Sequence, residues 1–189
     1  MVEDGILYNA DQSQLLVCLP YKTGALTIKD NVRVLSDNAF YNCTGLTSII
    51  LPSQLQYISL AVFVGCSSLT TLNIPASVLS IGYGSITGCT NLQSITVDAD
   101  NENYTSVGGV LYNKDKTTLL AFPNKAGTVI QIPDGTTSIE AYAFCMTGIL
   151  EVDIPASVTR LGTNAMSYCS QLTKISVHAK KPYTLDENA

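Results

Sequence analysis

The most informative stretch of this chain is Ile154-Pro155-Ala156-Ser157-Val158-Thr159-Arg160-Leu161-Gly162-Thr163-Asn164-Ala165-Met166-Ser167-Tyr168-Cys169-Ser170-Gln171-Leu172. It follows the pattern I-P-x-x-V-x-x-I-G-x-x-A-F-x-x-C-x-x-L, with Leu and Met at two of the apolar positions. Related stretches begin at Ile28, Leu51, Ile74 and Ile132, and the first three of these lie 23 residues apart. A fixed period of this length is the sequence signature of a solenoid.

Apolar residues recur in fixed columns of these five units. The phenylalanine column holds Phe40, Phe63, Ile86, Phe144 and Met166. The cysteine column holds Cys43, Cys66, Cys89 and Cys169. The fourth unit is one residue short, and we expect the register to slip at Cys145, which lies outside that column. We predict that both columns point into a shared core, because each unit of a solenoid buries its apolar face against its neighbours.

A second repeat interrupts the first. Residues 109–120 match residues 5–16, and each copy leads through a proline into a unit of the first kind. An apolar run, a polar turn and a second apolar run predict a β-hairpin in each copy. We therefore expect one continuous domain, 1–189, divided as follows. Its parts are an N-terminal hairpin at 1–27, three repeats at 28–96, a hairpin insertion at 97–131, two repeats at 132–176 and a C-terminal tail at 177–189.

Each unit should contain one strand and one bent return. Strands such as residues 46–51 would align in a parallel sheet, about 4.8 Å apart, and the proline that follows should mark the strand's end because it cannot donate to a ladder. Small residues before the phenylalanine column predict a short helical or 3-10 turn that crosses the core. The residues therefore predict a β-rich solenoid of short parallel strands with two inserted β-hairpins.

This unit closely resembles the BspA-type leucine-rich repeat, and the resemblance covers nearly the whole chain. It implies a β-rich leucine-rich-repeat solenoid, a right-handed superhelix of parallel short strands with two inserted β-hairpins. The motif at residues 109–120 is similar to an insertion common in bacterial members, and residues 177–185 resemble the segment that follows a repeat block. The resemblance implies an exported protein on the surface of host-associated bacteria that adheres to host matrix, mucosa or other cells. It brings no catalytic residues and no cofactor. The chain starts without a basic and apolar leader, so we expect that a leader has been removed.

The cysteines have three possible roles: disulfide partner, metal ligand or buried thiol. No close C-x-x-C pair occurs, as structural metal sites usually require. Side chains stacked in parallel do not readily reach the disulfide torsion, and unpaired cysteine is among the most buried residue types. We therefore favour free buried thiols, and we expect Cys18 and Cys145, outside the column, to be the more reactive.

Catalysis is improbable. The only histidine is His178, near the end of the stack, and no hydrolase, metalloprotease or phosphate-binding motif is present. Paired carboxylates of a glycan hydrolase remain a distant alternative. The acidic run Asp98, Asp100 and Glu102 alternates oxygen ligands as a calcium loop does, but it lacks the glycine and the distant glutamate of an EF-hand. We interpret it as a solvated turn, with calcium binding as the alternative.

Composition limits the classes of partner that this chain is expected to bind. Hydrophobic residues make up 46% and charged residues 13%, and the net charge is −5. An acidic chain lacks the basic stripe that neutralises nucleic-acid phosphates. No apolar run is long enough to span a membrane, and Lys180-Lys181 is too small a cluster to hold a membrane surface. A protein or glycan on a host or neighbouring cell remains as the expected ligand.

The candidate binding surface is the outward face of the predicted sheet. It comprises Ser48, Ile50, Thr71, Asn73, Ser94, Thr96, Glu151, Asp153, Lys174 and Ser176. Solenoids commonly bind through such an extended concave surface. A rival site is the hairpin tyrosines Tyr8, Tyr104 and Tyr112, because exposed aromatics are favoured at contacts. We expect a non-catalytic surface adhesion module, with purely structural spacer repeats as the alternative.

Overall fold

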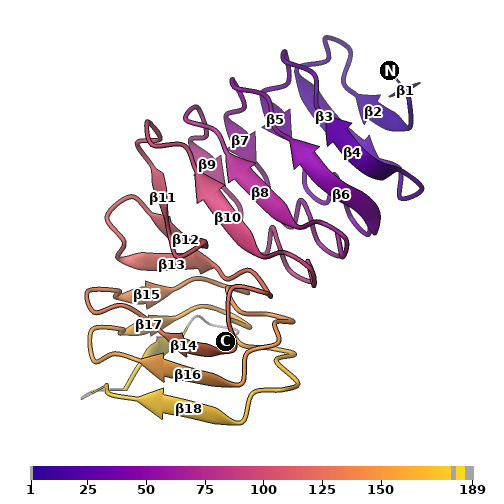
Figure 1. Ribbon diagram of the computed structural model, residues 1–189. Helices are drawn as coiled ribbons and strands as arrows, with labels where there is room; N and C mark the ends of the chain where they lie inside the picture. The colour runs from indigo at the N-terminus through magenta and orange to yellow at the C-terminus, as the bar shows by residue number, and fades with distance from the viewer. Residues whose placement is uncertain (1, 180–181, 186–189) are drawn as a thin grey trace.

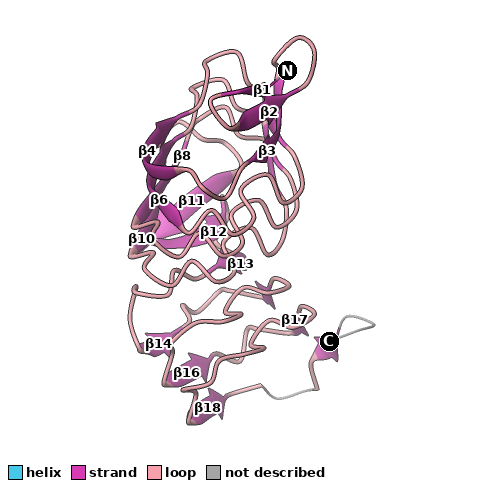
Figure 2. Cartoon of the chain, turned by 90° about the vertical axis from the view of Figure 1, so that its right-hand side faces the viewer, coloured by secondary structure: helices cyan, strands magenta, loops and turns pink. Residues whose placement is uncertain are grey.

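The computed structural model describes residues 2–179 and 182–185. The chain forms a β-solenoid, as the repeat predicted, and it has about seven turns. Figure 1 shows two stacks of coils that meet at an angle between β10 and β13. Each coil carries a front strand and a back strand on opposite sides of the core, and Figure 2 shows the two sets from the side.

The strands fall into three sets. The front strands are β4 (Thr23–Thr27), β6 (Gly45–Ile50), β8 (Thr71–Ile74), β10 (Ser94–Val97), β14 (Val129–Gln131), β16 (Glu151–Ile154) and β18 (Lys174–Val177). The back strands are β3 (Gln14–Cys18), β5 (Val34–Leu35), β7 (Tyr57–Ile58), β9 (Ser80–Ile81), β13 (Thr118–Ala121), β15 (Ser138–Ile139), β17 (Arg160–Leu161) and β19 (Thr184–Leu185). The remaining strands, β1 (Val2–Glu3), β2 (Ile6–Tyr8), β11 (Tyr104–Val107) and β12 (Val110–Asn113), belong to the hairpins.

Neighbouring coils pair in parallel and in the register of the repeat. Leu72 lies opposite Ile95 between β8 and β10, and Leu35 lies opposite Ile58 between β5 and β7. The predicted role of proline is confirmed, because Pro75 directly follows the last residue of β8. Each core column is thereby built from residues one period apart.

The turns between back and front strands are not helical, so the predicted short helical turns are wrong. No helix occurs among residues 2–179 and 182–185. Two positions in every unit have positive φ, which interrupts a right-handed helix. These residues are Asn38, Ala61, Gly84, Tyr142 and Asn164 at the first position, and Asn42, Gly65, Gly88, Met146 and Tyr168 at the second.

The turns between back and front strands pair with one another along the stack. The backbone N–H groups of Asn38, Phe40 and Asn42 donate to carbonyl oxygens of Leu60, Val62 and Val64 in the next coil, at 3.0, 2.9 and 2.8 Å. A helix would have used these donors within its own turn. These turns therefore remain extended because each one is hydrogen-bonded to the turn of the next coil.

The phenylalanine column fills the core. Phe40, Phe63 and Phe144 are completely buried, and the rings of Phe40 and Phe63 stack with centroids 5.5 Å apart. Two apolar clusters occupy the two stacks. They meet at β12, where Leu111 packs into the first cluster and Val110 into the second.

The cysteine column binds each coil to the one before it. Thiol groups of Cys66, Cys89 and Cys169 donate to carbonyl oxygens of Phe40, Phe63 and Phe144, at 3.2, 3.1 and 3.0 Å. All of these sulfurs thus bond to the phenylalanine of the preceding full coil. The column therefore ties successive coils together as well as filling the core.

The irregular fourth unit keeps its register further than expected. Thr147 takes the cysteine's place, because its N–H donates to the Phe144 carbonyl at 3.1 Å, as the Cys66 N–H donates to the Phe63 carbonyl. The Thr147 hydroxyl donates to the same carbonyl at 2.6 Å. Ile149, completely buried, then fills the leucine position one residue early. The missing residue therefore lies between Thr147 and Ile149, and the predicted slip at Cys145 is wrong.

The two hairpins begin short coils of the solenoid. The return strand β3 pairs in parallel with β5, and β13 pairs in parallel with β15. Both hairpins carry a bulge at the same place, between Leu7 and Tyr8 and between Leu111 and Tyr112. After β3 and β13 the chain reaches the next front strand without making the long turn of a full coil. The chain is therefore two stacks in tandem, each begun by a hairpin and a short coil.

All six cysteines are free, and only Cys169 is partly exposed. The prediction that Cys18 and Cys145 are the more reactive is wrong, since both are buried. Burial raises the pKa of the Cys145 thiol and raises the pKa of Cys89 to about 12. Thiolate, the reactive form, is therefore scarce at these positions.

We expect an alkylating reagent at neutral pH to modify Cys169 first, with the other five thiols reacting only as the core opens. Mass spectrometry of peptides from a time course measures each rate. Modification of Cys145 at the rate of Cys169 would contradict this assignment. A denatured sample, in which six thiols react alike, is the control.

Candidate binding face

The first group of candidate residues lies on the front strands of the N-terminal stack. Thr71 is opposite Ser94, and Asn73 is opposite Thr96. The Thr96 hydroxyl donates to the Asn73 side-chain oxygen at 3.0 Å. Ser48 and Ile50 lie on β6, and Ile50 is 57% exposed. We call these six residues the N-terminal patch.

The second group lies on β16 and β18. Glu151 is opposite Lys174, and Asp153 is opposite Ser176. The Lys174 ammonium lies 3.3 Å from Glu151, and the His178 Nε2 atom lies 2.7 Å from Asp153 Oδ1. Both contacts are largely exposed, so solvent screens them. Glu151, Asp153, Lys174 and Ser176 form the C-terminal patch.

A groove of about 280 Å³ runs along the C-terminal patch. Five of its lining residues lie outside the predicted set: Val129, Ile130, Gln131, Val152 and His178. Val129 and Gln131 belong to β14, which lies within the range predicted as a hairpin insertion and so outside the predicted front strands. The register of the repeat nevertheless places β14 among the front strands, because Gln131 pairs with Asp153 of the next unit.

The two patches do not form one strip. The Ile95 N–H donates to the Gly109 carbonyl oxygen at 2.8 Å, so the second hairpin covers the free edge of β10. Beyond the hairpin, β14 starts a new front sheet with β16 and β18. Figure 1 shows this break between the upper and lower stacks.

The hairpin tyrosines do not provide an exposed site. Tyr8 and Tyr112 are buried, and they pack into the first and second core clusters respectively. Tyr104 is half-buried, and its hydroxyl accepts the Ile81 N–H at 2.9 Å. More exposed aromatic residues, Tyr83 and Tyr168 among them, lie at the turns instead.

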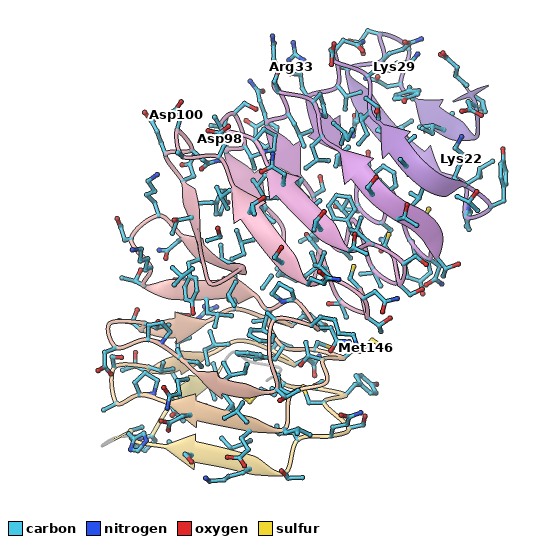
Figure 3. All side chains as sticks on the ribbon, viewed as in Figure 1. Lys22, Lys29, Arg33, Asp98, Asp100 and Met146 are labelled. Carbon is cyan, nitrogen blue, oxygen red and sulfur yellow. The ribbon has the colours of Figure 1, made fainter. Side chains whose placement is uncertain are left out.

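The acidic run closes the end of the N-terminal stack. Asn101 is completely buried, and its amide donates to the carbonyl oxygens of Pro75 and Val78 at 2.9 and 3.2 Å. Asp98 accepts the Asp100 N–H at 3.0 Å, and Figure 3 shows both carboxylates at the outer edge of the molecule. Within the described ranges no group of three or more His, Cys, Asp or Glu residues could hold a metal ion.

The face offers hydroxyl, amide and charged groups on a rigid frame. Such groups match the backbone of a protein ligand or the hydroxyls of a sugar. No helix of the described chain is long and apolar enough to cross a membrane.

Solved structures of three bacterial proteins resemble this chain. The pneumococcal vaccine antigen PcpA shares 26% identity and a TM-score of 0.75, over 82% of this chain and 39% of that one. A leucine-rich cell-surface protein of Faecalibacterium prausnitzii A2-165 shares 30% identity and a TM-score of 0.68, over 81% and 41%. A leucine-rich repeat protein of Eubacterium ventriosum ATCC 27560 shares 24% identity and a TM-score of 0.57, over 93% and 63%. The chain thus spans less than two thirds of each.

No curated protein matches the chain. The family model for the BspA type leucine rich repeat region matches residues 21–128 and 116–189. These ranges include the repeat units and the second hairpin, whose geometry is described above. The chain therefore belongs to the BspA-type leucine-rich repeat family.

Proposed function

We propose that this chain is a non-catalytic binding module, displayed at a bacterial surface, that recognises a protein or glycan on a host or neighbouring cell. The observation that carries the proposal is the groove of the C-terminal patch, where polar side chains from three adjacent front strands line one concave surface. The similarity to a cell-surface protein of Faecalibacterium prausnitzii supports the location.

The chemistry of the groove favours a polar ligand with some apolar surface. Glu151, Asp153 and Lys174 supply both signs of charge, Gln131 adds an amide, and His178 adds an imidazole. Val129, 63% exposed, adds an apolar contact at the same groove. Complementary charges of this kind improve specificity and association rate more than raw affinity.

The alternative is a spacer within a longer surface protein. The observation in its favour is the tandem arrangement, in which a hairpin and short coil begin a stack twice in one chain. Repetition of a stack lengthens a rod without requiring any ligand.

The variant Lys174→Glu separates these alternatives. It places a second carboxylate beside Glu151 and removes the positive charge of Lys174 from the groove, so we expect binding to immobilised mucin or matrix protein to weaken about tenfold or more. The melting temperature should change little, since exposed ion pairs contribute little stability. Surface plasmon resonance measures the affinity.

The matched control is Lys116→Glu, in the exposed turn of the second hairpin and outside the groove. Equal loss of binding in both variants would show a net-charge effect and refute the patch. An absence of binding by the unmodified chain across a broad array of matrix proteins and glycans would favour the spacer.

A further inference from the structure

The phenylalanine column is interrupted where the two stacks meet. In the first stack the ring of Phe40 stacks on that of Phe63. In the second stack the rings of Phe122 and Phe144 pack with their centroids 5.2 Å apart. The column position between these two pairs belongs to Ile86, in the last full coil before the short one. Because isoleucine is smaller than phenylalanine, the column lacks one aromatic ring at this place.

The coils on the two sides of this position are also held less closely together. In the second unit the Phe63 N–H donates to the Ser85 carbonyl oxygen at 2.8 Å. The matching bond would join the Ile86 N–H to the Ala121 carbonyl oxygen of the short coil, but the Ile86 N–H has no hydrogen-bond partner in the described chain. The same holds for the N–H groups of Gly84 and Gly88. A smaller side chain and a missing backbone bond therefore leave space at the same point.

A cavity of about 160 Å³ occupies this space. Its walls are mainly apolar and include Phe63 and Ile95 from full coils, together with Leu120 and Ala121 from β13. An apolar cavity of about 150 Å³ is large enough to bind a benzene molecule. Phe122 is not part of these walls, so a ligand can enter while the short coil keeps its place. One aromatic ring therefore fits into the gap in the column.

The mouth of the cavity carries a carboxylate and an aromatic ring. Tyr83, after β9, and Glu140, after β15, line both the cavity and a hollow on the adjoining surface. Tyr83 is 50% exposed, and its ring stacks on that of Tyr142 with centroids 6.1 Å apart. The cavity therefore reaches the surface beside a negative charge and the rings of two tyrosines.

The Glu140 carboxylate keeps one oxygen available for a ligand. Its Oε1 atom accepts the Ala141 N–H at 3.0 Å. The same oxygen lies 3.9 Å from the Arg160 guanidinium, which is beyond hydrogen-bond distance. The Oε2 atom accepts no hydrogen bond within the described chain. The mouth thus favours a group that carries N–H donors and a positive charge.

We propose that this cavity binds a small aromatic compound with an ammonium group, such as an arylalkylamine. The aromatic ring enters the gap beside Ile86 and takes the place of the missing member of the phenylalanine column. The ammonium group stays at the mouth, where it donates to Glu140 Oε2 and lies close to the Tyr83 ring, a contact that cation–π attraction favours. The cavity is separate from the groove of the C-terminal patch, so the two sites stand or fall independently.

The probe is benzylamine, which joins the ring of a phenylalanine side chain to an ammonium group. In an NMR titration of the isotope-labelled chain at neutral pH, we expect saturable shifts of the Tyr83, Ile86 and Ala121 amides, with a Kd at or below roughly 1 mM. Phenylacetate, which carries a carboxylate instead, should bind about tenfold more weakly because it meets the like charge of Glu140. Unmoved amides in excess benzylamine would overturn the proposal, and equal affinity for phenylacetate would refute the role of Glu140.

Two variants and a matched control sharpen the test. Ile86→Phe supplies the missing ring, so it should abolish benzylamine binding and raise the melting temperature by about 2–4 °C. Glu140→Gln should weaken benzylamine binding about tenfold and leave the binding of uncharged toluene unchanged. Glu102→Gln removes an exposed carboxylate outside the cavity and should alter neither affinity. Equal affinity of Ile86→Phe, Glu140→Gln and the unmodified chain for benzylamine would refute the site.

Discussion

Replacement of Phe63 with alanine should lower the free energy of unfolding by about 3–5 kcal/mol. The Phe63 ring is completely buried and stacks on Phe40, so its removal loses apolar burial and leaves a void. Phe63 also borders the existing cavity at the junction. The enlarged void has few ways to collapse, which favours the upper part of this range.

Equilibrium unfolding in urea, followed by circular dichroism, measures the loss. The exposed Val129→Ala is a suitable control and should change stability by less than about 0.5 kcal/mol. An unchanged midpoint for Phe63→Ala would refute the core assignment. The double variant with Phe40→Ala should lose less than the sum of the two single losses, because the ring pair is removed only once.

Replacement of Gly162 with alanine should be destabilising by about 1–3 kcal/mol. A Cβ atom there would lie 2.6 Å from the Glu140 carbonyl carbon in the neighbouring coil. The Gly162 N–H donates to the Ile139 carbonyl at 2.8 Å, so the two backbones are already bonded closely. A methyl group would push the coils apart and lengthen that bond.

Gly108→Asn provides the matched control for this effect. Gly108 has φ of 58°, and a Cβ atom at this residue would have no neighbouring atom within 4 Å. Asparagine tolerates this backbone conformation. Thermal unfolding should show a clear loss of stability for Gly162→Ala and little change for Gly108→Asn. Equal melting temperatures for the two variants would show that coil spacing at Gly162 is not limiting.

Most of the fold could be predicted because a solenoid is specified locally. Each unit contacts only its neighbours, so residues one period apart, such as Phe40 and Phe63, must share a column. The duplicated hairpin is equally visible, since residues 5–16 and 109–120 repeat one another. The structure confirms the family, the parallel coils and the proline positions.

Three features could not be predicted, and all depend on what the next coil provides. Small residues in the turns predict a helix, but N–H groups such as that of Phe40 bond to the following coil. The position of Cys145 predicts a slip there, whereas Thr147 makes the backbone bond of the cysteine column. The repeat pattern assigns the front strand β14 to the hairpin insertion because its coil is short, although Gln131 pairs with Asp153 in the register of the repeat.

The sequence by itself determined that this chain is a stack of BspA-type coils, because the period of its apolar residues leaves one way to bury them. The duplicated hairpin also marks the interruption in the sequence, but tertiary structure alone decided which groups the interruption separates or leaves unpaired. The short coil after β13 separates the two candidate patches and leaves Gly84, Ile86 and Gly88 without partners in the described chain. The physical reason is that a backbone N–H carries no sequence signal, and whether it is paired depends on the coil beside it.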